Sequence, residues 1–136
     1  LGFSRVDGAF LVGAGSLGCA LLQDKGLSAF GLQIEAAFDT DKTKIGTKVN
    51  DIEIFHIDQF RAMAAERKVV IGIITVPAEH AQNVADLMVA WGIKAIWNFT
   101  PARIKVPTHI VVQNTTIYMN LAILFNKLYN DKGEKK

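Results

Sequence analysis

A glycine-rich string between an apolar run and a helical pattern constrains the fold of this 136-residue chain more than any other feature. Residues 9–12 are continuously apolar, which is typical of a strand buried on both faces of a parallel sheet. Residues 13–18 read Gly-Ala-Gly-Ser-Leu-Gly, and residues 16–27 follow a helical pattern. We therefore predict a strand, a tight turn and a helix in direct succession, the arrangement that binds the pyrophosphate of a dinucleotide.

Each glycine of this string has its own predicted role. Gly13 makes the tight turn, Gly15 lets the backbone approach a pyrophosphate, and Gly18 lets helix and strand pack closely. The helix N-terminus offers N–H groups and a partial positive charge to phosphate oxygens. The predicted cofactor-binding residues of the string are Gly13, Ala14, Gly15, Ser16, Leu17 and Gly18. A tight turn without a ligand is the alternative.

An aspartate at the end of a second predicted strand, residues 32–38, completes the pattern. Asp39 follows the glycine string by about 20 residues, where a carboxylate accepts hydrogen bonds from the adenosine ribose. Such a carboxylate repels a 2′-phosphate, so NAD(H) is favoured, although Lys42 and Lys44 leave NADP(H) open. An Asx turn is the alternative role for Asp39, and Asp41 is a second candidate for the ribose contact.

The remaining pattern alternates strands with helices and predicts an α/β fold of one domain, residues 1–136. Further strands are expected at residues 52–55, 69–75, 94–99 and 109–113, and helices at residues 59–67 with Asp58 as N-cap, from Pro77 to Gly92, and at residues 115–129. Connections of this length favour right-handed crossovers. We therefore predict a Rossmann fold, a doubly wound parallel sheet in the order 3-2-1-4-5-6 with helices on both faces.

Residues after the fourth and fifth predicted strands are expected to line the rest of the cofactor cleft. Ligands of open parallel sheets bind outside the carboxyl ends of the strands, where the strand order reverses. The residues concerned are Thr75, Val76, Pro77, Asn98, Phe99 and Thr100. Plain loop structure is the alternative for each.

The sequence predicts no catalytic residue and no metal site, so we do not expect an enzyme. His56, His80 and His109 pair with no carboxylate at useful spacing and form no metal-ligand pattern. Cys19 is expected to be a small residue packing helix on sheet, with a redox-active thiol as the alternative.

Charge and composition bound the partners and the compartment. Fifteen Lys and Arg residues against 13 Asp and Glu residues give a net charge of +2, too small for a nucleic-acid footprint in this chain. A single cysteine and the lack of a membrane-spanning apolar run favour the cytoplasm. Because the chain begins with Leu1, we expect a fragment of a longer protein.

The last predicted helix is apolar nearly all round from Ile117 to Tyr129, where only Asn120, Asn126 and Lys127 are polar. Such a helix must be buried on more than one side, and it is too short to span a bilayer. We therefore predict a homodimer formed through this helix, which is exchanged between subunits in one form of the prediction.

Five strings in this order and spacing resemble the Rex redox-sensing transcriptional repressors: residues 9–18, 36–39, 72–78, 81–86 and 92–99. The resemblance implies a bacterial homodimer whose N-terminal winged-helix domain, absent from this sequence, binds operator DNA. It also implies that this domain binds NADH or NAD⁺ at the residues named above and that NADH releases the protein from DNA. Two departures are Thr100, where alanine is expected, and the run Thr116, Ile117 and Tyr118, where an acidic residue followed by an aromatic is common at 116 and 117.

Two other classes of protein remain as alternatives. One is the cofactor-binding fragment of an NAD-dependent dehydrogenase, and the other is a CoA-binding domain of similar fold, which also binds a pyrophosphate at a glycine turn. For the sensor, we expect an apolar nicotinamide pocket around Val76, Phe99 and Ile117 to disfavour the charged ring of NAD⁺. The sequence leaves open the operator sequence, the regulated genes and the ratio of the two affinities.

Overall fold

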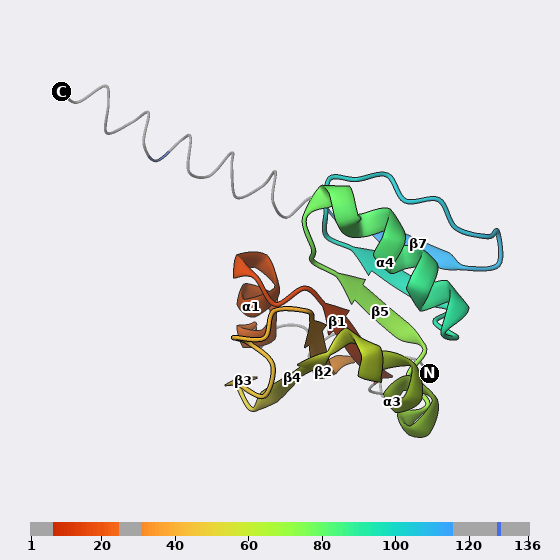
Figure 1. Ribbon diagram of the computed structural model, residues 1–136. Helices are drawn as coiled ribbons and strands as arrows, with labels where there is room; N and C mark the ends of the chain where they lie inside the picture. The colour runs from red at the N-terminus through yellow and green to blue at the C-terminus, as the bar shows by residue number, and fades with distance from the viewer. Residues whose placement is uncertain (1–6, 25–30, 116–127, 129–136) are drawn as a thin grey trace.

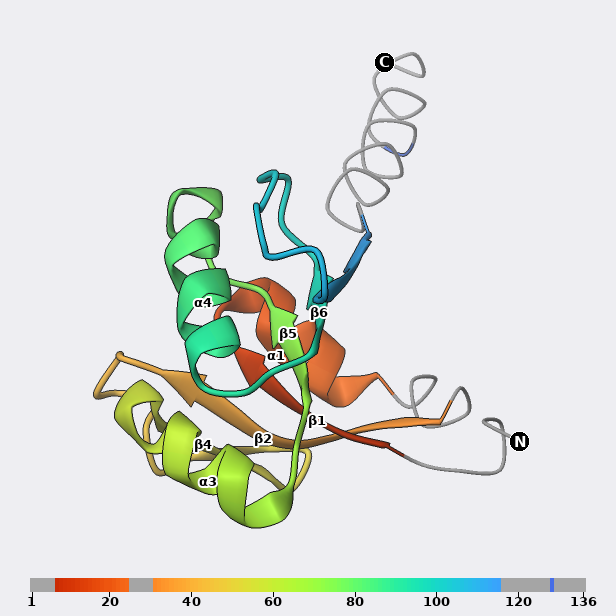
Figure 2. The same ribbon diagram turned by 90° about the vertical axis from the view of Figure 1, so that its right-hand side faces the viewer.

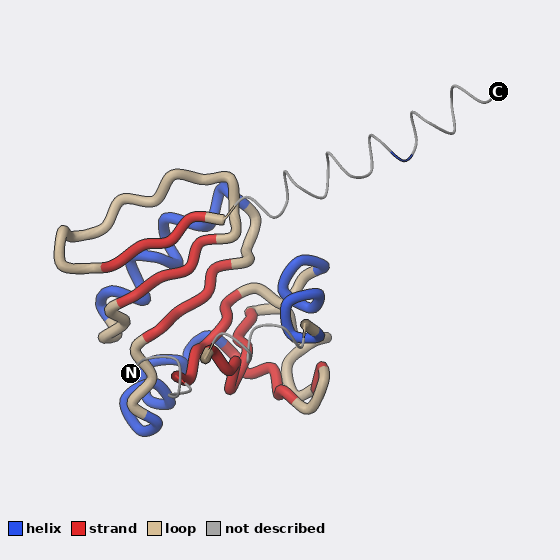
Figure 3. The backbone as a smooth tube through the Cα atoms, turned by 180° about the vertical axis from the view of Figure 1, so that it is seen from behind, coloured by secondary structure: helices blue, strands red, loops and turns tan. Residues whose placement is uncertain are grey.

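The computed structural model describes residues 7–24, 31–115 and 128, which contain a seven-stranded sheet flanked by helices (Figure 1). The strands are β1 (Asp7–Val12), β2 (Leu32–Asp39), β3 (Lys48–Val49), β4 (Ile52–His56), β5 (Ile71–Ile74), β6 (Ala95–Asn98) and β7 (Val111–Asn114). Their order is β3-β4-β2-β1-β5-β6-β7, and every pair is parallel except β3 with β4. The predicted order is confirmed for the six parallel strands. The sheet is seen from behind in Figure 3, with its strands in red.

The antiparallel edge strand β3 was not predicted, because its residues fall in and next to a polar loop. It pairs Lys48 with Glu53 and Val49 with Ile52. The hairpin turns through Asn50 and Asp51, whose φ angles are 52° and 64°. Both angles lie in the left-handed region that a tight two-residue hairpin turn requires. A two-residue strand is too short to show a periodic pattern in the sequence.

Helices cover both faces of the sheet, as predicted. They are α1 (Ser16–Gln23), the 3₁₀ helix η2 (Ile57–Gln59), α3 (Phe60–Arg67) and α4 (Ala78–Ala90). One apolar cluster includes residues of α3 and α4, and a second includes Leu21 and Leu22 of α1. Figure 2 shows α3 and α4 on the same side of the sheet. The glycine turn between β1 and α1 therefore lies at the carboxyl edge of a sheet with two separate cores.

The helix α4 forms as its pattern predicts. Its buried residues are Ala81, Val84, Ala85 and Met88, spaced to lie on one face. Pro77 precedes its first turn, and Gly92 follows its end with a φ of 96°.

The predicted N-cap at Asp58 is wrong. Asp58 lies inside η2, and the His56 side chain caps that helix by accepting a hydrogen bond from the Asp58 backbone N–H. The chain thus enters α3 through a turn of 3₁₀ helix, which needs no side-chain cap from Asp58.

The last predicted helix and the dimer contact through it fall on residues 116–127 and 129–136, outside the described residues. Among the helices that the structure describes, none has the length and apolar character needed to cross a membrane.

Candidate functional site

The glycine turn between β1 and α1 is fixed by close contacts within the turn and with Thr75, the residue that follows β5. Gly13 has a φ of 108°, and a Cβ atom there would lie 2.8 Å from the backbone of Thr75. A Cβ atom at Gly18 would lie 1.9 Å from the carbonyl oxygen of Gly13. No larger residue fits at either position without movement of the backbone. The tight turn and the close helix packing predicted for these two glycines are therefore present.

Gly15 is different, because its missing side chain faces open space. A Cβ atom at Gly15 would meet no atom within 4 Å, and Gly15 lines a cavity at the carboxyl edge of the sheet. It is the N-cap residue of α1 and provides no side-chain hydrogen bond. The first backbone N–H groups of a helix have no partner within the helix. This end of α1 can therefore receive an anionic group.

The carboxylate of Asp39 joins the end of β2 to the glycine turn. Its Oδ2 accepts a hydrogen bond of 2.8 Å from the Ala14 N–H, and its Oδ1 accepts from the N–H groups of Thr40 and Asp41 at 2.7 and 3.0 Å. The Asx turn considered for Asp39 is thus observed. The carboxylate also lines the cavity, so its position is compatible with a ribose contact.

A lysine of the next loop reaches the same turn. The Lys44 ammonium group donates a hydrogen bond of 2.8 Å to the carbonyl oxygen of Ala14. Asp41 accepts hydrogen bonds from the Thr43 hydroxyl at 2.7 Å and from the Thr43 N–H at 2.9 Å. These bonds lower the pKa of the Asp41 carboxyl, and the Lys44 charge lowers it further. Asp41 is therefore negatively charged at neutral pH.

These groups surround a cavity of about 490 Å³, a size typical of small-molecule sites. Six residues predicted from the sequence line it: Gly13, Gly15, Asp39, Thr75, Val76 and Pro77. Asp41, the second candidate for the ribose contact, and Lys44, considered for its charge, also line it. Seven others were not included in the prediction: Val12, Thr40, Ile57, His80, Asn83, Val84 and Leu87. Helical spacing after Pro77 could have identified the last four, since they share one side of α4.

Thr75 lines the cavity but also holds the turn. Its side chain is buried, and its hydroxyl Oγ1 lies 2.7 Å from the Gly13 oxygen and 3.1 Å from the Val12 oxygen. The Thr75 hydroxyl therefore holds the carbonyl groups of Val12 and Gly13, where β1 ends and the glycine turn begins.

Three predicted residues at the end of β6 and directly after it are not in the lining of this cavity. Asn98 is fully buried, donates hydrogen bonds to the Ala102 oxygen and Asn114 Oδ1, and accepts from the N–H and hydroxyl of Thr100. Phe99 is buried beside the Trp97 ring, with centroids 4.6 Å apart. The Thr100 N–H and hydroxyl groups bond to Asn98 Oδ1 across the turn that follows the strand, so these polar groups face each other.

The other members of the glycine string contribute in different ways. Ala14 is buried, Leu17 packs partly buried against the second core, and the Ser16 side chain is exposed. Cys19 is half-buried, and its thiol donates to the Ala14 oxygen at 3.3 Å.

The described part of the chain contains no group of three side chains able to hold a metal ion. His56 caps η2, whereas His80 and His109 are exposed. His80 lies on the α4 wall of the cavity.

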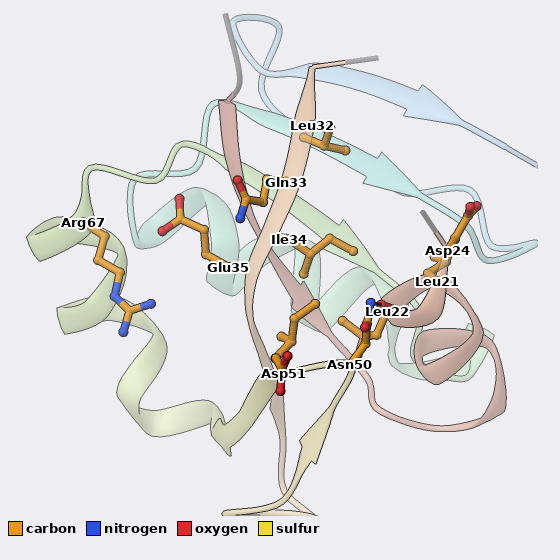
Figure 4. Close-up of a pocket in the computed structure, with 11 residues that line it drawn as sticks. Leu21, Leu22, Asp24, Leu32, Gln33, Ile34, Glu35, Asn50, Asp51 and Arg67 are labelled. Carbon is orange, nitrogen blue, oxygen red and sulfur yellow. Dashed lines mark hydrogen bonds between the residues drawn. The ribbon is translucent and has the colours of Figure 1, made fainter. Parts of the chain in front are cut away.

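A second cavity, of about 760 Å³, lies at the opposite end of β2 (Figure 4). It is lined by residues 32–35 of β2 together with Asn50, Asp51 and Arg67. It is larger, but neither the glycine turn nor Asp39 lines it. Because parallel sheets place ligands at the carboxyl ends of their strands, the smaller cavity is the candidate site.

This chain is similar to one family of domains and to a group of transcriptional repressors. Residues 7–102 match the CoA binding domain family. The redox-sensing transcriptional repressor Rex of Bacteroides thetaiotaomicron is 58% identical over 128 residues, which cover 94% of this chain and 58% of that protein. The Rex protein of Treponema denticola is 44% identical over 124 residues, covering 91% of this chain and 59% of that protein.

Solved structures of a Rex-family repressor, RSP, share the fold. RSP in complex with β-NADH has a TM-score of 0.82 and 31% identity, covering 99% of this chain and 65% of that chain. RSP in complex with β-NAD⁺ and operator DNA has a TM-score of 0.82 and 30% identity, covering 98% and 62%. This chain thus spans less than two thirds of the length of each of these proteins. UDP-D-quinovosamine 4-dehydrogenase of Vibrio fischeri, 17% identical with a TM-score of 0.56, shares the fold alone.

Proposed function

Because this chain belongs to the Rex family of repressors and, at the level of the domain, to the CoA-binding domain family, we propose that it is the NADH/NAD⁺-sensing domain of a redox-responsive transcriptional repressor. It is a regulator and not an enzyme in this proposal, since its relatives are repressors. One observation carries the proposal. The glycine turn, the N-terminus of α1 and the Asp39 carboxylate meet around a single cavity.

The cavity supports a dinucleotide with a free 2′-hydroxyl. The α1 N-terminus beside Gly15 receives the pyrophosphate, and Asp39 lies where the adenosine ribose binds in this fold. Asp41 adds a second negative charge to the same wall. Two carboxylates disfavour the additional phosphate of NADP(H), so NAD(H) is the proposed cofactor.

Sensing requires that NADH and NAD⁺ bind with different free energies, because a ligand shifts an equilibrium only by its differential affinity. The oxidised nicotinamide ring is charged, and apolar surroundings disfavour its desolvation. Of the three apolar residues proposed for this pocket, Val76 lines the cavity, Phe99 is buried in the core, and Ile117 is outside the described residues. Each ~1.4 kcal/mol of difference gives a tenfold preference.

The rest of the proposal concerns the whole protein. The neighbour crystallised with operator DNA supports DNA binding through a domain outside this chain, which we propose is an N-terminal winged helix. The homodimer through the helix from Ile117 to Tyr129 and release from DNA by NADH are part of the same proposal. A repressor acts where its DNA lies, so the proposed location is the cytoplasm.

Competitive titration of the purified chain with NADH, NAD⁺, NADPH and CoA tests the cofactor. We expect NADH to bind most tightly, with NADPH at least tenfold weaker. Tightest binding of CoA, with no displacement by NADH, would instead support the CoA-binding alternative, which the domain match favours. Equal affinity for NADH and NAD⁺ would exclude redox sensing while leaving a cofactor-binding dehydrogenase fragment open.

A second assay tests the regulatory half of the proposal. The longer natural protein should release a labelled operator fragment when NADH is added and keep it with NAD⁺. Sedimentation of the chain should show a dimer at micromolar concentration, and a chain ending at Thr115 should sediment as a monomer. A monomer in both cases would refute the predicted dimer contact.

A further inference from the structure

The backbone N–H and the carbonyl oxygen of Ala14 are held by the last residue of β2 and by the loop that follows it. Its N–H donates to Asp39 Oδ2 at 2.8 Å, and its carbonyl oxygen accepts from the Lys44 ammonium at 2.8 Å. Ala14 stands between the tight turn at Gly13 and the open position at Gly15. The two bonds therefore set the direction in which the glycine turn enters α1, although neither side chain belongs to that turn.

The backbone of Lys44 is itself fixed, so its ammonium group is delivered to one place. The Lys44 N–H donates to the backbone carbonyl oxygen of Asp41 at 3.0 Å, and the backbone carbonyl oxygen of Lys44 accepts from the Thr47 hydroxyl at 2.6 Å. Two residues further along, the Gly46 N–H donates to the backbone oxygen of Ile54 in β4 at 2.8 Å. The turn that carries Lys44 is thus attached to the sheet.

The group that the Lys44 ammonium bonds indicates the role of this lysine in the cavity. Lys44 is the single Lys or Arg among the described residues that line the cavity. Asp39 and Asp41, of opposite charge, line the same cavity. Its ammonium bonds a carbonyl oxygen of the glycine turn, whereas Lys42, two residues earlier, is exposed and outside the lining. A lysine near the ribose site would ordinarily be expected to accommodate a 2′-phosphate.

We propose that Lys44 is a positioning residue for the phosphate-binding turn, acting through Ala14, and that it does not serve as the counter-ion of a 2′-phosphate. This inference rests on the proposed dinucleotide function. Lys44 then sets how tightly every dinucleotide binds, and Asp39 with Asp41 sets the preference for NAD(H) over NADP(H). The two roles predict different patterns when the lysine is removed.

The test compares Lys44→Met with Lys42→Met, which removes the same charge from the same loop without touching Ala14. A charge-assisted hydrogen bond contributes enough for Lys44→Met to weaken NADH binding by about tenfold or more, while Lys42→Met changes it by less than about twofold. NADPH binding should weaken by the same factor as NADH binding, so their ratio stays constant. Lys44→Arg should recover part of the affinity, because a guanidinium group can also donate to the Ala14 oxygen.

Amide hydrogen exchange, measured without ligand, separates the positioning of the turn by Lys44 from a general effect of its charge. The Ala14 and Gly15 amide hydrogens should exchange with solvent faster in Lys44→Met than in wild type or Lys42→Met, with equal melting temperatures identifying the effect as local. A fall in NADPH affinity much larger than that in NADH affinity would show that Lys44 binds the 2′-phosphate and overturn the proposal. Equal effects of the two lysine substitutions would also overturn it. Wild-type protein that binds no dinucleotide would refute the proposed function itself, a distinct outcome.

Discussion

Replacing Gly15 by alanine should weaken NADH binding, whereas replacing Gly18 by alanine should lower the stability of the fold. The reason is that Gly15 faces open space and Gly18 is packed tightly. At Gly18 the new Cβ atom would lie 1.9 Å from the Gly13 oxygen and 3.0 Å from the Thr75 hydroxyl oxygen. Relieving this overlap requires α1 to move away from β1, which costs about 1–3 kcal/mol and weakens the hydroxyl bond of Thr75 by about 1 kcal/mol. Alanine regains about 1 kcal/mol of helix propensity.

The net loss for Gly18→Ala is therefore about 2 kcal/mol of unfolding free energy. For a domain of this size, each kcal/mol lowers the melting temperature by about 4 °C, so calorimetry should show a fall of about 8 °C.

At Gly15 the backbone already has φ −80° and ψ −159°, an extended conformation that alanine adopts readily. The added methyl group meets no atom within 4 Å and enters the space of the cavity. The lower helix-capping ability of alanine, about 1 kcal/mol or less, is offset by its smaller unfolded-state entropy. We expect a melting temperature within about 3 °C of wild type and NADH affinity reduced at least tenfold.

Two outcomes would refute this reasoning. Unchanged NADH binding in Gly15→Ala would mean that the ligand does not approach this turn. A loss of stability in Gly15→Ala equal to that in Gly18→Ala would mean that the open space beside Gly15 is filled in solution.

Three further predictions concern the core, the buried amide and one carboxylate. Phe60→Ala should lower the unfolding free energy by about 3–5 kcal/mol in denaturant titrations, because Phe60 is fully buried at the centre of an aromatic cluster; a loss under 1 kcal/mol would contradict that packing. Asn98→Ala should destabilise the fold by about 1–3 kcal/mol, since the Ala102 oxygen loses its donor, while NADH affinity among the folded molecules changes less than threefold; a selective loss of affinity would place Asn98 in the binding site. The lowered pKa of Asp41 stabilises the fold above the unfolded value of 3.8, and this contribution disappears as pH falls through the folded pKa. Asp41→Asn should therefore reduce the acid-induced fall in melting temperature, and an unchanged pH profile would contradict the Thr43 hydrogen bonds as its cause.

Much of the fold could be predicted because it depends on local patterns. Buried parallel strands appear as short apolar runs, and α4 shows its buried face through residues such as Ala81 and Met88 at helical spacing. The glycine turn was predictable because its residue types are dictated by contact distances, as at Gly18. The edge strand β3 was not, because two residues show no period and its geometry depends on pairing with β4.

The site was predictable in its location and less so in its details. The sequence identified Asp39 but could not show that its carboxylate bonds Ala14, a residue 25 positions away, since that bond depends on how β1 and β2 pair. Lys44 was considered only for its charge, because the direction of a long side chain cannot be derived from its position in a loop. Asn98 ends a strand and Thr100 follows it, as cleft residues often do, yet their hydrogen bonds to each other keep them out of the cavity lining.

The central claim is that a dinucleotide binds at the carboxyl edge of the sheet, in the cavity of about 490 Å³ beside the glycine turn. Amide chemical shifts of the isotopically labelled chain, recorded during titration with NADH, test this most directly. We expect saturable changes at the glycine turn, at residues 39–44 and at Val76, with little change around Arg67 in the larger cavity. Changes confined to the residues around Arg67, or no saturable change at any residue, would contradict the assignment of this site.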